Sequence, residues 1–226
     1  MISNTMSRRQ MMLGASSLAA IALAGCASTT PGPSALSPAP AVPEIPSDIL
    51  AMYAAVPDER FFIPAADIHL VDPIYWRQEV ENKTGEKAGT VVVDTPNRFL
   101  YWTMPNGRAM RYGVGIGREG FAWQGRGHIA YGREWPVWTP PAEMIARQPE
   151  LEPYRNGMEP GLENPLGPRA LYIHQGNRDT LYRLHGNMDA RSIGQAVSSG
   201  CVRLLFQDVI DLYERVTWGA EIVVVQ

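Results

Sequence analysis

The chain has 226 residues, and its 20 basic and 23 acidic side chains give a formal net charge of −3 at pH 7. This mild acidity, with no cluster of lysine and arginine, argues against nucleic acid as a partner. The length suits one folded domain with flanking segments.

Residues 1–25 have the pattern of an export signal. Arg8 and Arg9 precede an apolar stretch, residues 11–24, which is too short for a comfortable membrane span. The stretch ends in Leu-Ala-Gly-Cys, which is similar to a bacterial lipobox, so the pattern predicts that Cys26 is lipidated and becomes the mature N-terminus. An ordinary signal peptide, with Cys26 an incidental residue near the cleavage point, is the alternative.

Residues 26–46 are rich in proline, alanine and serine, a composition that stays extended and buries little apolar surface. We expect a disordered tether between a lipid anchor and a folded domain. Ala27, which follows the lipidated cysteine, favours the outer membrane over the inner one, as in enteric bacteria. The expected location is therefore the periplasm, with the lipid anchor as the only membrane contact.

Residues 47–88 form a lead-in with no regular pattern beyond a short helical piece near residues 49–55, and the sequence indicates no role for it. From residue 89 onward the pattern is typical of β-strands. The glycine- and proline-rich residues between 117 and 170 give no strand prediction. The expected strands cover residues 90–94, 98–102, 109–116, 171–174, 180–185 and 221–225.

Two local signals join these strands into a fold. Asn106-Gly107 lies between two expected strands and predicts a tight hairpin turn. Apolar residues at 209, 212, 213 and 216 fall at i, i+3, i+4 and i+7, which predicts a helix. The sequence therefore predicts one mainly β domain over residues 89–226, with a short helix near its C-terminal end.

The chemistry centres on Cys201, the only cysteine of this domain, and on His185, which ends an apolar strand. Acyl transfer by a thiol needs a nucleophile, a base, a group that orients the base, and donors for the oxyanion. Gly186 would let the backbone turn sharply, so that a carbonyl orients the imidazole. The amides of Gly200 and Cys201 are candidate oxyanion donors, and Arg203 would hold the loop or meet a carboxylate.

Taken alone, Cys201 and His185 could each have a purely structural role, since a single cysteine or histidine is more often a packing residue. The combination in an exported chain favours catalysis. His69, His128 and His174 show no spacing typical of metal ligands, so neither a metal site nor a cofactor is expected. His174 is the second candidate for the base.

The order of the motifs gives a more specific indication. His185-Gly186, followed by the run Ser198-Ser199-Gly200-Cys201-Val202-Arg203-Leu204, resembles the L,D-transpeptidase catalytic domain, also called the YkuD domain. The resemblance covers about residues 89–226 and points to the periplasmic ErfK/YbiS-type branch. It implies a β-sandwich with a short C-terminal helix packed on it. Further segments that resemble the family are residues 116–120, 138–141, 164–171 and 208–216.

The resemblance also implies a reaction. Cys201 would attack the diaminopimelate–D-Ala bond of a peptidoglycan tetrapeptide stem, form a thioester, and pass the acyl group to an amine of another stem or of an envelope protein. His185 would be the proton donor and acceptor, and the Gly186 backbone its orienter. The catalytic loop would comprise Ser198, Ser199, Gly200 and Arg203. Candidates for the donor groove are Trp123, Tyr131, Trp135 and Trp138, although aromatic side chains more often belong to the core.

Two positions depart from the family pattern. Ser199 stands where the family often has histidine, and Phe206 stands where an asparagine cap often precedes the last helix, so Gln207 or Asp208 would have to start that helix. Two other functions stay open on the same sequence. One is an L,D-carboxypeptidase or a hydrolase that releases proteins from peptidoglycan, and the other is a non-catalytic peptidoglycan-binding lipoprotein. The acceptor and the oligomeric state are not decided by the sequence.

Overall fold

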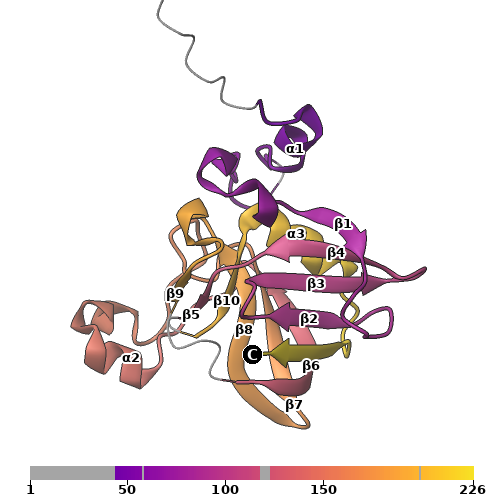
Figure 1. Ribbon diagram of the computed structural model, residues 1–226. Helices are drawn as coiled ribbons and strands as arrows, with labels where there is room; N and C mark the ends of the chain where they lie inside the picture. Colours follow the sequence, from indigo (N-terminus) through magenta and orange to yellow (C-terminus); the bar gives the residue numbers. More distant parts are fainter. Residues whose placement is uncertain (1–43, 58, 118–122, 199) are drawn as a thin grey trace, which may run out of the picture. The chain divides into compact units, whose positions relative to one another are not determined.

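A computed structural model describes residues 44–57, 59–117, 123–198 and 200–226. Within these residues nine strands form one sheet, in the order β1-β4-β3-β2-β11-β6-β7-β8-β10 (Figure 1). Its strands are β1 (Gln78–Glu81), β2 (Val91–Asp94), β3 (Phe99–Met104), β4 (Arg108–Gly113), β6 (Gly125–Glu134), β7 (Arg169–Gln175), β8 (Arg178–Asn187), β10 (Val202–Leu205) and β11 (Glu221–Val225). A short second sheet pairs β5 (Ile116–Gly117) with β9 (Ala196–Ser198).

Short helices precede the first strand and occupy several connections between later strands. The α-helices are α1 (Ser47–Met52), α2 (Ala142–Arg147) and α3 (Phe206–Arg215). The 3₁₀ helices are η1 (Ile68–Leu70), η2 (Pro73–Tyr75), η3 (Pro149–Tyr154) and η4 (Ala190–Ser192). In the part of the chain that the structure describes, no helix is long and apolar enough to cross a membrane.

The predicted hairpin is present between β3 and β4. The two strands pair antiparallel from Phe99 opposite Gly113 to Met104 opposite Arg108. At the turn, Asn106 and Gly107 both have positive φ angles, 60° and 69°. This is the backbone that a two-residue turn needs to match the twist of its strands, and asparagine and glycine adopt it most readily.

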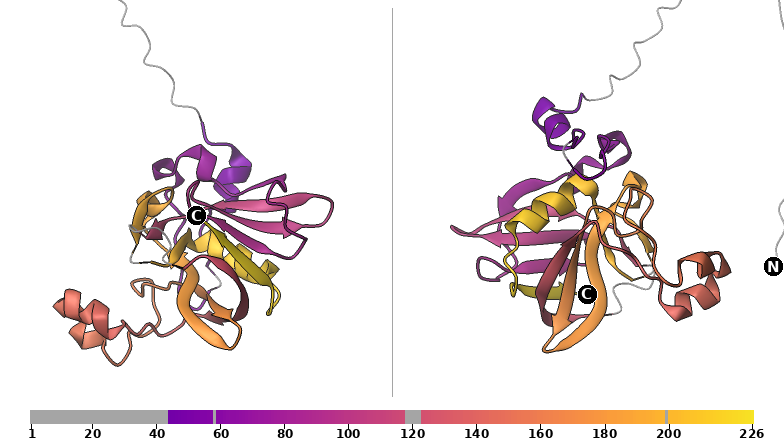
Figure 2. Two further views of the ribbon diagram at one scale, coloured as in Figure 1. Left: turned by 60° about the horizontal axis from the view of Figure 1, so that its bottom comes forward. Right: turned by 180° about the vertical axis from the view of Figure 1, so that it is seen from behind.

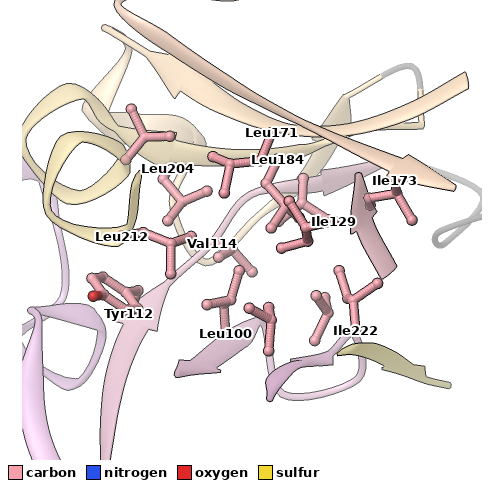
Figure 3. Packing of buried hydrophobic residues seen from close by; sticks show 14 of the residues in the cluster. Leu100, Tyr112, Val114, Ile129, Leu171, Ile173, Leu184, Leu204, Leu212 and Ile222 are labelled. Atoms are coloured by element: carbon pink, nitrogen blue, oxygen red, sulfur yellow. The ribbon is translucent and has the colours of Figure 1, made fainter. Parts of the chain in front are cut away.

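The main core lies between two groups of strands of the same sheet. Figure 3 shows Leu100 and Ile222, from β3 and β11, facing Leu171 and Leu184, from β7 and β8. The apolar side of α3 completes this core through Val209 and Leu212, as its sequence periodicity predicts. The mainly β fold with a C-terminal helix is thus confirmed, and its two layers are joined through the pairing of β11 with β6.

Strand β6 is an element that the sequence pattern missed. It contains several glycines, which normally weaken strand predictions. Two of them are needed for close packing: a side chain at Gly127 would come within 2.6 Å of the His174 carbonyl oxygen, and one at Gly132 would collide with the rings of Tyr213 and Trp218. Pairing with β11 and β7 therefore decides the conformation of this segment, against its local propensity.

The lead-in packs on the domain, although the sequence indicated no role for it. Residues 44–226 form one compact unit, and β1 is the edge strand of the main sheet, paired with β4. Figures 1 and 2 show the lead-in segment beside α3. A second core, here called the lead-in cluster, consists of the buried residues Tyr53, Ile68, Val71, Ala190, Ile193 and Leu205.

A buried polar network joins the lead-in to α3. The Tyr53 hydroxyl donates to Asp208 (Oη–Oδ2 3.2 Å), and the Arg77 guanidinium lies 3.7 Å from Asp208 and 3.1 Å from Asp211. Burial raises the pKa of Asp208 to about 7, although Arg77 opposes the shift. The Gln207 amide donates to lead-in carbonyls, among them that of Pro64 at 3.0 Å.

These contacts correct the expectation for the start of α3. The helix begins at Phe206 itself, after Leu205, and no side chain caps it by a hydrogen bond. Phe206 is buried, with 3 % of its surface exposed, so its ring packs in the interior. Gln207 and Asp208 bind the lead-in instead of capping the helix, and tertiary contacts replace the missing cap.

Candidate active site

Alternation along β8 and β10 sets which side chains face away from the core. The strands are parallel neighbours, and Leu184 lies opposite Val202, with both side chains fully buried in the core. Because successive side chains of a strand point to opposite faces, His185 and Arg203, which also lie opposite each other, project from the other face. Cys201 directly precedes Val202, so the same register brings the cysteine next to Arg183 of β8.

His185 is held by its own strand. Its side chain is buried, with 6 % of the residue exposed. The Nδ1 atom lies 2.9 Å from the Gly186 carbonyl oxygen. Since a carbonyl only accepts, we assign the proton of the neutral ring to Nδ1, which leaves Nε2 as the acceptor. Burial lowers the pKa of His185 to about 4, and the charges of Arg203 and Arg183 lower it further. Hydrogen bonds to the carbonyls of Gly186 and Pro165 act in the opposite direction.

The Gly186 carbonyl meets the His185 ring as expected, but the backbone around it differs from the expectation. Gly186 lies within β8, opposite Leu204, so no sharp turn occurs there. The expectation of a turn is wrong, and the reason for glycine is space. A Cβ atom at this position would come 2.8 Å from the Phe206 ring and 2.9 Å from Pro168 Cδ. The carbonyl that orients His185 is therefore fixed by strand pairing and by close packing.

Cys201 is half-buried. Burial raises the pKa of its thiol. A hydrogen bond from the backbone N–H of Arg183, together with the positive charges of Arg183 and Arg203, acts in the opposite direction. A thiol with a raised pKa, at the start of the strand that pairs with the one carrying a neutral imidazole, suits a mechanism in which the base removes the proton during attack.

The loop before Cys201 has a backbone that only glycine adopts readily. Gly200 has φ +131°, outside the range of ordinary side-chain-bearing residues. Arg203 is anchored through its main chain, which exchanges two hydrogen bonds of 2.8 and 2.9 Å with Gly115. Burial lowers the pKa of Arg203, and the neighbouring Cys201 and Asp189 oppose that shift.

Several predicted positions lie outside what the structure describes. Ser199 and Cys26 are outside the described residues, and so are residues 118–120 of one family-like segment. Only the backbone of Ser198 is described, as the last residue of β9.

Replacing Gly200 by alanine is expected to lower any activity that depends on Cys201 by about 10- to 100-fold, because strain at φ +131° would displace the neighbouring thiol. Gly176→Ala is the matched control. Gly176 also has positive φ, +58°, with open space around it, in the turn between β7 and β8. Thermal unfolding and turnover of both variants check this. If Gly200→Ala and Gly176→Ala lost activity equally, the loss would not come from displacement of Cys201.

The candidate groove aromatics divide into two groups. Tyr131 on β6 stacks on Tyr172 of β7, with ring centroids 4.5 Å apart, and the Arg183 guanidinium carbon lies 4.2 Å from the Tyr172 centroid. Tyr131 therefore belongs to a row of side chains that ends at the strand carrying His185. Trp135, in contrast, is 4 % exposed and donates to Glu59 (Nε1–Oε2 2.8 Å), so it is a core residue.

The two other groove candidates also have structural contacts. Trp123 packs against the main core, and Trp138 forms an isolated β-bridge with Met158. Among the residues that the structure describes, no group of three or more histidine, cysteine, aspartate or glutamate side chains could hold a metal ion.

His174 is separated from His185 along the sheet. It lies on β7 opposite Asp179, whereas the β7 residue opposite His185 is Ala170, four positions away. At about 3.3 Å per residue this is a separation of roughly 13 Å along β7. The geometry therefore favours His185 over His174 as the partner of Cys201.

Comparisons with known proteins agree with this arrangement. The family model YkuD, described as the L,D-transpeptidase catalytic domain, matches residues 88–225. A protein of Fuscovulum blasticum, named as an L,D-transpeptidase of the ATP synthase subunits region, is 32% identical over 138 residues, which are 60% of this chain and 68% of that protein. Escherichia coli (strain K12) "Probable L,D-transpeptidase YbiS" is 32% identical over 139 residues, 59% of this chain and 43% of its own.

One solved structure is similar over most of its length. It is a Brucella melitensis protein titled as a probable carnitine operon oxidoreductase, and it is 45% identical to this chain. The match covers 70% of this chain and 99% of that chain, with a TM-score of 0.48. The present chain thus spans most of some relatives and less than half of YbiS. Because the family model covers more than half of the sequence and includes His185 and Cys201, the chain belongs to the L,D-transpeptidase catalytic domain (YkuD) family.

Proposed function

We propose that this protein is a peptidoglycan L,D-transpeptidase in which Cys201 is the nucleophile and His185 the base. The observation that carries the proposal is the buried His185 ring, bound through Nδ1 to the Gly186 carbonyl, on the strand next to Cys201. This ring is neutral at physiological pH, because burial lowers its pKa to about 4. A neutral imidazole that carries its proton on Nδ1 is the form that accepts a proton at Nε2.

In the first half-reaction, the Cys201 sulfur attacks the carbonyl carbon of the third residue, a diaminopimelate, of a tetrapeptide stem. The thiol proton passes to Nε2 of His185. The amides of Gly200 and Cys201 are proposed to stabilise the oxyanion of the tetrahedral intermediate. When the C–N bond breaks, His185 returns the proton to the amine of the leaving D-Ala, and the acyl group remains on sulfur as a thioester.

In the second half-reaction, an amine of another stem or of an envelope protein attacks the thioester. His185 takes a proton from the amine, the C–S bond breaks, and the thiol is restored. If water takes the place of the amine, the same steps give an L,D-carboxypeptidase or a hydrolase that releases bound proteins. The two outcomes differ only in which nucleophile reaches the thioester.

The proposed setting is the periplasm. The paired arginines, the apolar stretch and the sequence around Cys26 support export and lipidation, and the proline-rich tether would let an anchored domain reach the peptidoglycan. The lipid on Cys26, attachment to the outer membrane and an envelope protein as acceptor are parts of this proposal.

The test is a product assay with the purified full-length protein, tetrapeptide muropeptides and mass spectrometry. Cross-linked dimers that disappear in Cys201→Ala are the expected products. Tripeptides without dimers would favour the hydrolase. Unchanged substrate that still binds the protein would favour a non-catalytic peptidoglycan-binding lipoprotein and contradict both enzymatic functions.

The acid limb of kcat/KM is expected near pH 4, because the base must be neutral and burial lowers the pKa of His185 to about 4. At pH 5.5 an ordinary histidine, with a pKa of about 6.5, would be neutral in only roughly one molecule in ten. We expect kcat/KM at pH 5.5 to lie within about twofold of its value at pH 7. Steady-state kinetics checks this, with unfolding monitored at each pH. A limb near pH 6.5 would contradict it.

A further inference from the structure

An ion pair in an unusual position lies next to the site. The Arg183 guanidinium donates to both oxygens of Asp179, at 2.7 and 2.8 Å. The two residues are four apart on β8, and in a regular strand such positions are separated by about 13 Å. The pair can form only because the strand is irregular here. The β7–β8 register shifts between Tyr172 and His174, opposite this part of β8.

The irregularity involves a backbone conformation that is costly for a side-chain-bearing residue. Leu181, between Asp179 and Arg183, has φ +66°, and its side chain is 74 % exposed. Its N–H donates to Asp179 Oδ1 at 2.8 Å, which helps to hold the turn. A branched apolar residue in this conformation costs on the order of 1–3 kcal/mol, and irregularities of this kind next to active sites often re-aim a side chain.

The Arg183 side chain is fixed on a second side as well. Its guanidinium carbon lies 4.2 Å from the ring centroid of Tyr172, its neighbour on β7. Its side chain is 14% exposed, and that of Asp179 is 34% exposed. Burial raises the pKa of Asp179, but the hydrogen bonds from Arg183 and Leu181 outweigh burial and lower it, so this carboxylate is ionised at neutral pH.

Arg183 is the residue of β8 that comes opposite Cys201, because Cys201 directly precedes Val202 and Val202 pairs with Leu184. The backbone N–H of Arg183 donates to the Cys201 sulfur, and its charge favours the thiolate, as that of Arg203 does from the other strand. Two further titratable side chains of the described residues lie within two positions of Arg183 on β8. Tyr182 interacts with Cys201 and has a raised pKa, so it is uncharged, and His185 is neutral because burial lowers its pKa.

We propose that Asp179 is a positioning residue that fixes the side chain of Arg183, the residue of β8 opposite Cys201, and that the charge of Arg183 thereby makes the thiol a better nucleophile. The strained turn at Leu181 is then part of the active site, because it brings the two side chains together. The inference rests on the proposed function only in taking Cys201 as the nucleophile. The reactivity of the sulfur is measurable without any peptidoglycan substrate.

The test is the rate of alkylation of Cys201 by iodoacetamide as a function of pH, in the full-length protein. Peptide mapping after digestion separates Cys201 from Cys26. We expect Arg183→Gln and Asp179→Asn each to slow alkylation at pH 7 by about tenfold and to raise the apparent pKa of the thiol by about one unit. Arg178→Gln is the matched control. It removes the same charge from an exposed position on the same strand and is expected to change neither quantity.

A double variant shows whether Asp179 acts through Arg183. If it does, Asp179→Asn in the Arg183→Gln background has no further effect, whereas independent effects would add. Arg183→Lys, which keeps a cation, is expected to recover part of the rate and guards against a general folding defect. Wild-type alkylation in Asp179→Asn, additive effects, or equal losses in the lysine and glutamine variants would overturn the proposal. Failure of the muropeptide assay alone would count against the proposed reaction and leave these rates unaffected.

Discussion

Replacing His185 by glutamine is expected to lower kcat for tetrapeptide turnover by about 10²- to 10⁴-fold, the usual contribution of a positioned general base. Glutamine is close to histidine in size and is not a base at neutral pH, so the variant removes the proton acceptor with little change in volume. The cost should be large because burial raises the pKa of the Cys201 thiol, and few molecules ionise at neutral pH without a base.

The pH dependence of this variant gives a second readout. Without a base, the reaction depends on the thiolate already present, so the rate of His185→Gln should rise about tenfold per pH unit up to the pKa of Cys201. His174→Gln is the control, since His174 lies on the neighbouring strand β7, opposite Asp179. It is expected to retain wild-type kcat. If His174→Gln lost activity and His185→Gln did not, the base would be His174, and the assignment of His185 would be wrong.

A chain that begins at residue 88, where the family match begins, is expected not to fold cooperatively. It would lack Tyr53, Ile68 and Val71, each 3 % exposed or less. Burial of such side chains contributes about 1.5–3 kcal/mol each, so their loss alone removes roughly 5–9 kcal/mol from a domain whose total stability is about 5–15 kcal/mol.

The truncation would also expose the residues of α3 that contact the lead-in. Asp208 would lose Tyr53 and Arg77, and the Gln207 amide would lose its carbonyl acceptors. Because α3 directly follows β10, this damage lies one element away from Cys201. Urea and thermal unfolding, followed by circular dichroism, compare the truncated chain with one that begins at residue 44. Cooperative unfolding of both chains at the same midpoint would show that the lead-in is dispensable.

Local pattern predicted those parts of the fold in which propensity and tertiary structure agree. The turn at Asn106-Gly107 and the C-terminal strand Glu221–Val225 occur as expected, because each signal is specific to one backbone geometry. Strand β6 was missed because its glycines are required by the rings and carbonyls that pack against them, and no local pattern contains that information. Trp135 was one candidate for the groove, with the core as the alternative, and its buried ring and its hydrogen bond to Glu59 make it part of the interior.

The site was predicted to a similar extent. The motifs around His185 and Cys201 identify residues that the structure brings to neighbouring strands. The reason for Gly186 was misjudged, because a glycine that opens a turn and one that avoids Phe206 look the same in a sequence. Asp179 and Arg183 were missed altogether. An acid and a base four apart suggest a pair on a helix, and only the irregular backbone at Leu181 allows that pair in a strand.

The most direct test of the central claim is the mass of the acyl-enzyme. Full-length protein is mixed with a tetrapeptide muropeptide without an acceptor amine, quenched in acid, and measured intact and after digestion. The proposed chemistry predicts an adduct equal to the muropeptide minus its terminal D-Ala, located on Cys201 and absent from Cys201→Ala. Release of D-Ala with no adduct on Cys201, or the same adduct on the alanine variant, would contradict it.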